Sequence, residues 1–352
     1  MEYRLIGNTG IKVSCLALGT DNFADPTPEK EASKILESSI DAGINLVDTG
    51  DVYADGEGEK IIGRTLNKSS KRDQVLIATK VDHGKRRPGY SIDDPSLFGP
   101  NDHGHSRLNI IRACENSLKR LQTDYIDIYQ LHRPSPEIHF DEILGAMTDL
   151  VRQGKVRYIG TSTHPSWMIM ESLMRSELKG YSRVVFEQPP YNLLDRRIEN
   201  ELIPMCQKHG IGLITWAPMA MGVLAGRYKK SDDFPKNSRA SLRGGFYADR
   251  VTKKGIEIGN KFLKIAEKID LTAAQLAILW VKDQLGVTAP LIGPRTLDHL
   301  ENLLTVADMR FTLERRRQSM LELRKVETSY SLSQVLFGLD LQINDGEVVT
   351  LL

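Results

Sequence analysis

The sequence has few of the features that mark secreted, membrane-spanning or disulfide-rich proteins. Its three cysteines, Cys15, Cys114 and Cys206, are scattered and odd in number, which is typical of buried thiols in a reducing compartment. The most apolar stretch, residues 211–226, is interrupted by Pro218 and several glycines and is too short to span a bilayer. The first residues lack the apolar core of a signal peptide. These absences predict a cytoplasmic protein.

An excess of charge of either sign is also missing. The 47 lysines and arginines nearly balance the 46 acidic residues, so the net charge is only +1 at pH 7. Such a balance creates no global field that would attract nucleic acid or an anionic membrane, and we expect neither partner. With 352 residues, of which 40% are hydrophobic and 26% charged, the composition is that of a globular protein with a large core.

Short apolar segments alternate with amphipathic ones along most of the chain. The apolar segments do not alternate internally, as expected of strands buried on both faces, and comprise residues 15–18, 44–47, 75–79, 125–129, 156–160, 184–186, 212–215 and 288–292. The helix-like segments comprise residues 29–42, 59–66, 108–121, 138–152, 166–178, 197–209, 271–285 and 297–304. Eight strands, each followed by a helix, predict an α/β protein with a (β/α)8 TIM barrel. No strand is followed by G-x-G-x-x-G, which disfavours a Rossmann fold.

Several segments add to this barrel. Residues 3–6 and 11–13 are expected to form an N-terminal β-hairpin around an Asn-Thr-Gly turn. Long connections over 82–107 and 217–254 follow the third and seventh strands. They therefore rise from the C-terminal face of the barrel, where this fold places its chemistry. Residues 314–326 are expected to form a last surface helix. The predicted domains are a barrel over residues 1–328 and a tail over residues 329–352.

Four polar side chains stand at or just beyond strand ends and are expected to meet at one mouth. They are Asp48, Lys80 and His132, together with Tyr53, which follows Asp48 in the same loop. An ammonium at the end of an apolar strand requires a partner, and Asp48 can supply it to Lys80. Taken singly, Asp48 is explained equally well as a turn cap, His132 as a core histidine and Tyr53 as a loop aromatic. The combination is much less common by chance.

The combination of these side chains suits proton donation to a carbonyl group. A free tyrosine has a pKa of about 10, and a neighbouring lysine ammonium is expected to lower the pKa of Tyr53. His132 can hydrogen-bond the carbonyl oxygen while Tyr53 gives its proton. No side chain supplies a hydride, so a nicotinamide cofactor is required. A metal-dependent hydrolase is disfavoured because Asp48 and His132 lack a further histidine or carboxylate at a strand end.

Short motifs in a fixed order carry a resemblance to one known family. They are Leu18-Gly19-Thr20, Val47-Asp48-Thr49 with Tyr53, Ala78-Thr79-Lys80, Tyr129-Gln130-Leu131-His132, Gly160-Thr161-Ser162, Glu187-Gln188 with Tyr191-Asn192, residues 222–228, and Ile292-Gly293-Pro294-Arg295-Thr296. Over residues 1–325 the chain resembles the aldo-keto reductases, in particular the members related to potassium-channel β subunits and bacterial aldehyde reductases. The resemblance implies a catalytic tetrad made of Asp48, Tyr53, Lys80 and His132, with Tyr53 as the proton donor.

The same resemblance implies NADP(H) as the cofactor. Ser162 and Gln188 match groups that hold the carboxamide, Trp216 matches the aromatic that stacks on the nicotinamide, and Arg295 matches the arginine that grips the 2′-phosphate. The implied cofactor-binding residues are Gly19, Thr20, Asp21, Asp48, Ser162, Thr163, Gln188, Trp216, Leu224, Gly226, Arg227, Gly293, Arg295, His299 and Asn302. His299, Asn302 and Leu303 depart from the residues that relatives often place around the adenine, which predicts a weaker adenine grip.

The function implied by these residues is the reversible, NADPH-dependent reduction of small aldehydes or ketones to alcohols. The alternative is an NADPH-binding regulatory or redox-sensing subunit with little turnover. The basic run Lys85-Arg86-Arg87 in the first long connection favours anionic carbonyl substrates. Residues 335–352 are expected to turn like a hairpin, and they weakly resemble the segment before the phosphate loop of ABC-transporter ATPases. No G-x-x-x-x-G-K follows, so we assign no ATPase function.

Overall fold

The computed structural model describes residues 1–81, 101–311, 323–330 and 333–341, the last two ranges as backbone. The chain begins with an antiparallel hairpin of β1 (Tyr3–Leu5) and β2 (Lys12–Ser14), in which Arg4 pairs with Val13. Ile6 and Val13 are fully buried and pack with the side chains inside the barrel. The expected hairpin is therefore confirmed, and it helps to close one end of the barrel.

Eight parallel strands form a closed barrel in the order β10-β3-β4-β5-β6-β7-β8-β9. Their bounds are β3 (Ala17–Gly19), β4 (Leu46–Asp48), β5 (Leu76–Val81), β6 (Ile126–Leu131), β7 (Val156–Ser162), β8 (Val184–Gln188), β9 (Gly212–Thr215) and β10 (Ala289–Ile292). The register runs without a shift from β3 to β7, and one irregularity lies between β7 and β8. The predicted (β/α)8 architecture is confirmed.

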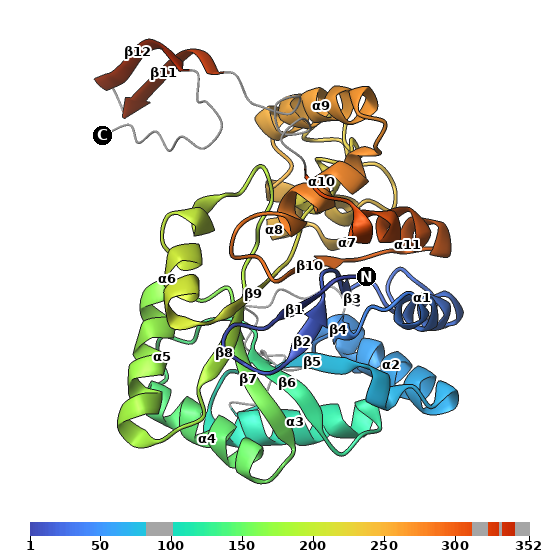
Figure 1. The fold of residues 1–352 in the computed structure, drawn as a ribbon, viewed down its shortest axis with the longest axis vertical. Coiled ribbons are helices and arrows are strands. Elements are labelled where there is room, and N and C mark those ends of the chain that lie inside the picture. The colour runs from blue at the N-terminus through green and yellow to red at the C-terminus, as the bar shows by residue number, and fades with distance from the viewer. Residues whose placement is uncertain (82–100, 312–322, 331–332, 342–352) are drawn as a thin grey trace.

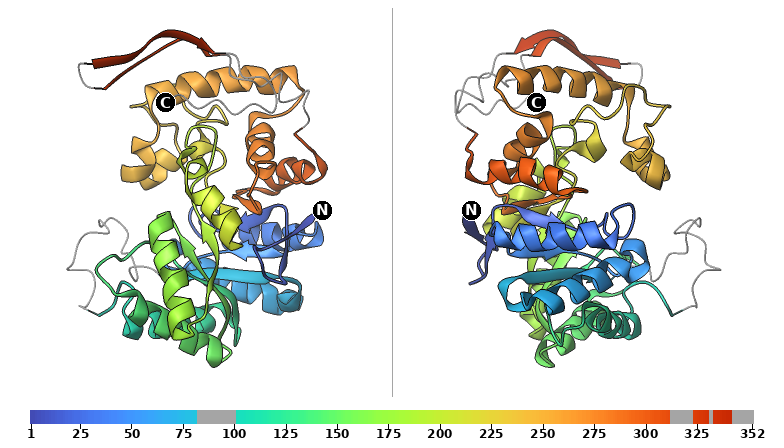
Figure 2. Two further views of the ribbon diagram at one scale, coloured as in Figure 1. Left: turned by 60° about the vertical axis from the view of Figure 1, so that its left-hand side comes forward. Right: turned by 90° about the vertical axis from the view of Figure 1, so that its right-hand side faces the viewer.

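Helices surround the strands (Figures 1 and 2). They are α1 (Glu29–Asp41), α2 (Glu57–Ser69), α3 (Arg107–Leu121), α4 (Phe140–Arg152), α5 (Ser166–Lys179), α6 (Leu202–His209), α10 (Ala273–Lys282) and α11 (Leu297–Leu304). Helix α10 begins with a capping box, in which the Thr272 side chain accepts from Gln275 N–H and the Gln275 side chain accepts from Thr272 N–H. None of the helices in the described part of the chain combines the length and apolarity that a bilayer crossing requires.

The sequence did not predict the helices in and after the second long connection. Helices α7 (Arg239–Arg243) and α8 (Gly245–Asp249) lie within residues 217–254, and α9 (Lys253–Lys268) begins at the end of that range. Helix α9 buries Ile256 and Phe262 against a separate apolar cluster that includes Val223 and Leu224. This cluster fixes the connection beside the barrel mouth, where α7 supplies charged side chains to the site described below.

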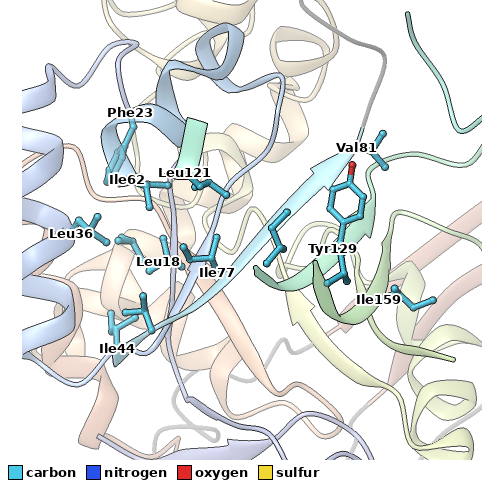
Figure 3. Close-up of a cluster of buried hydrophobic side chains, with 14 of the residues drawn as sticks. Leu18, Phe23, Leu36, Ile44, Ile62, Ile77, Val81, Leu121, Tyr129 and Ile159 are labelled. Carbon is cyan, nitrogen blue, oxygen red and sulfur yellow. The ribbon is translucent and has the colours of Figure 1, made fainter. Parts of the chain in front are cut away.

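The largest apolar core fills the space between the strands and the helices. Figure 3 shows Leu18 and Ile77 from the barrel strands together with Leu36 of α1 and Ile62 of α2. All four side chains are fully buried. Full burial of a leucine or isoleucine side chain is worth about 1.5–3 kcal/mol, so this layer holds the barrel in register and fixes the direction of its strand ends.

The C-terminal segment departs from the sequence-based expectation. A second hairpin is formed by β11 (Leu323–Tyr330) and β12 (Ser333–Leu341), with Val326 opposite Leu339. The helix expected over residues 314–326 is wrong where the chain is described, because residues 323–326 belong to β11. Alternating Val326, Thr328 and Tyr330 favour a strand, and this alternation outweighs the helix-forming residues before them.

Candidate active site

The carboxyl ends of the barrel strands gather the predicted polar side chains at one mouth. Asp48, Ser162 and Gln188 are the last residues of their strands, and His132 follows β6 directly. A cavity of about 890 Å³ opens here. Its wall includes the predicted residues Gly19, Thr20, Asp21, Asp48, Tyr53, His132, Ser162, Gln188, Trp216, Arg227, Gly293, Arg295, His299 and Asn302.

Lys80 lies at the base of this mouth and is tied to three oxygen atoms. Its side chain is 0% exposed, and Nζ lies 2.6 Å from Asp48 Oδ2, 2.8 Å from Thr49 O and 3.3 Å from the Tyr53 hydroxyl. An ammonium has three N–H donors, so these acceptors match its full hydrogen-bonding capacity. The expected pairing of Lys80 with Asp48 and Tyr53 is therefore present in the structure.

Strand alternation explains why Lys80 faces the barrel interior. Its neighbour Thr79 points the other way, and the Thr79 hydroxyl donates to Glu59 Oε1 at 2.6 Å. Glu59 belongs to α2, is fully buried, and also accepts from Arg120 Nε at 2.6 Å. This second buried charge network joins β5 to the helix that follows the Tyr53 turn.

Tyr53 is held by a tight turn between β4 and α2. Ala54 and Asp55 adopt positive φ angles of 48° and 55°, followed by Gly56 at 85°. Successive left-handed residues cost about 1–3 kcal/mol each for non-glycine side chains, so packing must over-determine this turn. The Tyr53 ring lies edge-on to the His132 ring, with centroids 5.9 Å apart. The turn thus brings the phenol, the imidazole and the ammonium together.

The electrostatic expectation for Tyr53 is wrong. Burial raises the pKa of Tyr53 well above its ordinary value, and the carboxylates of Asp48 and Asp21 raise it further, whereas Arg133 lowers it. Burial also lowers the pKa of Lys80, with Asp48 opposing that shift. The physical reason is burial, which disfavours the charged phenolate, and the neighbouring carboxylates add to the rise in pKa. The site holds the phenol in its protonated form.

Two glutamines at the mouth were not predicted to touch the tetrad. Gln188 Nε2 donates to Asp48 Oδ1 at 2.7 Å, and Gln130 Nε2 donates to the same oxygen at 3.2 Å. Asp48 therefore uses one carboxylate oxygen for Lys80 and the other for the two amides. The bond from Gln188 links the predicted carboxamide site to the tetrad. Gln130 had a sequence signal, since it lies within the motif that ends at His132.

Polar groups at the ends of β7 and β8 lie beside Gln188. The Ser162 hydroxyl donates to Gln188 O at 2.9 Å. Thr163 has a positive φ of 59°, and its hydroxyl accepts from Arg133 Nη1 at 2.6 Å. Glu187, the residue before Gln188 in β8, is fully buried and accepts from His164 N–H at 3.0 Å. Burial raises the pKa of Glu187 to about 8.

A group of arginines lines another part of the cavity wall. Burial lowers the pKa of Arg295, and the positive charges of Arg239, Arg227 and Arg243 lower it further. Arg295 Nη1 donates to Asn237 O at 2.6 Å, which fixes its guanidinium at the wall. A polyanionic ligand would relieve the repulsion within this group.

The sequence missed Arg239 and Arg243, which belong to the unpredicted helix α7. Arg239 pairs with Asp21, and Arg243 pairs with Asp25 at 2.7 Å. These ion pairs bridge α7 to the loop after β3 at the cavity wall. No motif within the connection singled out either arginine, because their proximity to the first barrel strand arises only in the folded chain.

Three predicted cofactor residues, Thr163, Leu224 and Gly226, do not line the cavity. The Leu224 side chain is fully buried in the apolar cluster beneath α9. Asn302 lies on the wall but already accepts from the Thr272 hydroxyl at 3.1 Å. The basic run Lys85-Arg86-Arg87 lies outside the described residues. Within the described part of the chain, no group of three histidine, cysteine, aspartate or glutamate residues is arranged to hold a metal ion.

A (β/α)8 barrel with titratable side chains clustered at the carboxyl ends of its strands defines a barrel enzyme architecture. The chain belongs to the aldo/keto reductase family, whose model matches residues 15–318. The resemblance identified from the short motifs is thereby confirmed, and the protein is an oxidoreductase of this family. The match ends before residues 335–352, whose likeness to ABC-transporter ATPases stays a prediction.

Individual relatives span nearly the whole chain. An uncharacterized oxidoreductase of Bacillus subtilis strain 168, YrpG, is 36% identical over 315 residues, covering 88% of this chain and 92% of its own. A probable voltage-gated potassium channel subunit beta of Arabidopsis thaliana is 33% identical over 314 residues, with 88% and 92% coverage. An aldo-keto reductase of Fusarium vanettenii is 34% identical over 337 residues, with 90% coverage of each chain.

Proposed function

We propose that this protein catalyses the NADPH-dependent, reversible reduction of small aldehydes or ketones to alcohols. The observation that carries the proposal is the position of Lys80 Nζ between the Asp48 carboxylate and the Tyr53 hydroxyl at the cavity base. A protonated phenol on the wall of a cavity, held by a buried ion pair, is suited to donate a proton to a carbonyl oxygen. Family membership supports the same class of chemistry.

The donor set of the cavity fits a phosphorylated dinucleotide. Ser162 and Gln188 offer polar groups for a carboxamide, and Trp216 offers an aromatic face. On another part of the wall, Arg295 and Arg227 belong to a group of guanidiniums whose mutual repulsion a phosphate would relieve. Gly293 leaves open space where a side chain would begin, so a ligand can approach the backbone there. When bound, the nicotinamide would supply the hydride.

The residues of the tetrad take distinct roles in this proposal. Tyr53 holds its proton until negative charge develops on the substrate oxygen, because burial keeps its pKa high. Lys80 hydrogen-bonds the phenol oxygen and stabilises it as the proton leaves, while Asp48 keeps Lys80 in position. His132, whose ring meets the Tyr53 ring, would hydrogen-bond the carbonyl oxygen and orient it.

The decisive experiment compares the wild type with Tyr53→Phe, using 4-nitrobenzaldehyde and following NADPH oxidation. Loss of a positioned general acid typically lowers the rate by about 10²–10⁴-fold, and we expect a decrease of that order in kcat. NADPH binding, measured by fluorescence quenching, should be retained because the phenylalanine ring keeps the shape of the cavity wall. Arg152→Met serves as a control, since Arg152 is exposed and lies at the end of α4. Unchanged kcat in Tyr53→Phe would refute Tyr53 as the proton donor.

A second candidate function is an NADPH-binding regulatory or redox-sensing subunit with little turnover. It is favoured by two plant relatives described as probable voltage-gated potassium channel subunits beta, from Arabidopsis thaliana and from Oryza sativa subsp. japonica at 33% identity. Tight NADPH binding without turnover on a broad panel of aldehydes and ketones would favour this candidate. For either function we propose a cytoplasmic location, because the three cysteines are free and buried, as in a reducing compartment.

A further inference from the structure

Two arginines that the proposed phosphate site does not use lie at the ring of Trp216, a residue of the cavity wall. The guanidinium carbons of Arg133 and Arg250 lie 5.8 Å and 5.2 Å from the centroid of the Trp216 ring. Arg133 lowers the pKa of Arg250, as do burial and Arg197, whereas Asp195 raises it. Of these two arginines, Arg133 lines the cavity together with Tyr53 and His132.

Arg133 is positioned beside the reacting groups. It directly follows His132, whose ring centroid lies 5.9 Å from that of Tyr53, and its positive charge lowers the pKa of Tyr53. Arg133 lines the cavity and is partly buried. An anionic group bound to this guanidinium would therefore share the cavity with a carbonyl group held between Tyr53 and His132.

The interactions of Arg133 leave capacity for a ligand. Its hydrogen bond from Nη1 goes to the neutral hydroxyl of Thr163 at 2.6 Å. Considering only the described residues, no carboxylate lies within ion-pair distance of Arg133, whereas Arg239 and Arg243 on the same wall pair with aspartates. A guanidinium presents five N–H donors in a planar fork. Most of these donors remain for an oxyanion, which a fork can bind through paired hydrogen bonds.

We propose that the physiological substrate is a carbonyl compound that also carries a carboxylate or a phosphate monoester, and that Arg133 binds this oxyanion. The proposal rests on the reductase function proposed above and names the substrate class of the same site. It makes Arg133 a specificity-determining residue, with Arg250 adding positive charge across the Trp216 ring. A partly buried guanidinium can form charge-assisted, paired hydrogen bonds with an oxyanion, which would stabilise the bound substrate.

The experiment compares two substrates of the same shape and different charge. In 4-formylbenzoate and 4-nitrobenzaldehyde, a planar group with two oxygens stands opposite the aldehyde, but only the carboxylate is charged at pH 7. The ratio of their kcat/KM values is measured with saturating NADPH for the wild type, Arg133→Met, Arg133→Lys and the exposed control Arg152→Met. Because each ratio is taken within one protein, the intrinsic reactivities of the two aldehydes cancel between variants.

We expect Arg133→Met to lower the ratio by about 10–100-fold, the usual loss for a charge-assisted hydrogen-bonded pair. Arg133→Lys should retain part of the preference, because it keeps the charge and loses the fork. Arg152→Met should leave the ratio unchanged. An equal loss for both aldehydes, accompanied by a higher KM for NADPH, would assign Arg133 to the cofactor and overturn the proposal.

A binding measurement separates this proposal from the proposed reductase function. Calorimetry of both aldehydes with the NADP+ complex, which has no hydride to give, should show tighter binding of 4-formylbenzoate to the wild type than to Arg133→Met. Turnover of both aldehydes without any charge preference would overturn the substrate class and leave the reductase intact. If neither aldehyde is turned over, but calorimetry shows that the wild type binds 4-formylbenzoate more tightly than Arg133→Met does, the reductase function is rejected and the anion site at Arg133 is retained. Glyceraldehyde 3-phosphate and glyceraldehyde, compared in the same way, identify which of the two oxyanions fits better.

Discussion

Replacing Asp48 by asparagine tests how far the buried ammonium of Lys80 depends on its carboxylate. The Lys80 and Asp48 side chains are 0% and 2% exposed, and their charged atoms are 2.6 Å apart. Asparagine keeps the size of the side chain and leaves Lys80 with two neutral acceptors, Thr49 O and the Tyr53 hydroxyl. Removing one partner of a buried pair typically costs about 3–5 kcal/mol, and we expect Asp48→Asn to lower the free energy of unfolding by that order at pH 7.

This loss should depend on pH, because Lys80 can avoid the penalty by releasing its proton. Burial lowers the pKa of Lys80 in the folded wild type, and Asp48 opposes that decrease, so Asp48→Asn lowers the pKa further. Above the folded-state pKa and below about 10.4, the unfolded chain binds one more proton than the folded chain, and stability rises with pH. The difference in the free energy of unfolding between the wild type and Asp48→Asn should therefore decrease with rising pH. This decrease should occur between the folded-state pKa of Lys80 in the variant and that of Lys80 in the wild type.

Urea unfolding, followed by circular dichroism from pH 7 to pH 9.5, measures this effect in a double-mutant cycle. The four proteins are the wild type, Asp48→Asn, Lys80→Met and the double variant, in which methionine fills most of the lysine volume. The double variant should lose less stability than the sum of the single losses, because no unpaired charge remains. Two results together would refute the assignment of Asp48 and Lys80 as a charged, mutually dependent pair. They are a stability loss of Asp48→Asn that does not change with pH, and a loss in the double variant equal to the sum of the single losses.

Two further predictions concern the titration of buried Glu187 and the role of Arg295 in cofactor binding. Burial raises the pKa of Glu187 to about 8, so the folded chain keeps a proton that the unfolded chain loses above about pH 4.3, and stability should fall as pH rises toward 8 by up to about 1.4 kcal/mol per unit. Glu187→Gln should flatten this decline in urea unfolding measured at pH 5, 6.5 and 8, and an unchanged slope would contradict the assignment. Arg295→Met should raise the KM for NADPH by about 10–100-fold while leaving the KM for NADH nearly unchanged, and equal effects on both cofactors would remove Arg295 from a phosphate site.

The parts of the fold that were predictable are those in which the pattern is local. Strand β5 is buried on both faces, as the segment 75–79 indicated, and Gly210, which follows the last residue of α6, has the positive φ of 65° that favours glycine. Helix α9 was missed although its residues buried against Val223 and Leu224 are spaced as an amphipathic helix requires. It was missed because the expected (β/α)8 pattern places each helix after a strand, and no strand was predicted directly before residue 253.

The candidate site divides in the same way. Asp48, Tyr53, Lys80 and His132 were found because each stands near the end of a recognisable strand, and parallel strands deliver their ends to one face. The direction of the pKa shift of Tyr53 was mispredicted because it depends mainly on burial of the phenol and on the nearby carboxylates of Asp48 and Asp21. Such effects depend on distances and solvent exposure that a linear pattern does not contain.

The sequence by itself determined the barrel and the family, because eight alternating strands and helices are a local pattern and the short motifs stand in a fixed order. It also predicted that Asp48, Tyr53, Lys80 and His132 would meet at one face. Only the tertiary structure decided that Gln130 and Gln188 share one oxygen of Asp48, and that Arg239 pairs with Asp21 at the cavity wall. It also decided that Arg133 lies beside Trp216 without a described counterion. These relations join residues far apart in the chain, and their energies depend on the dielectric and geometry that only folding creates.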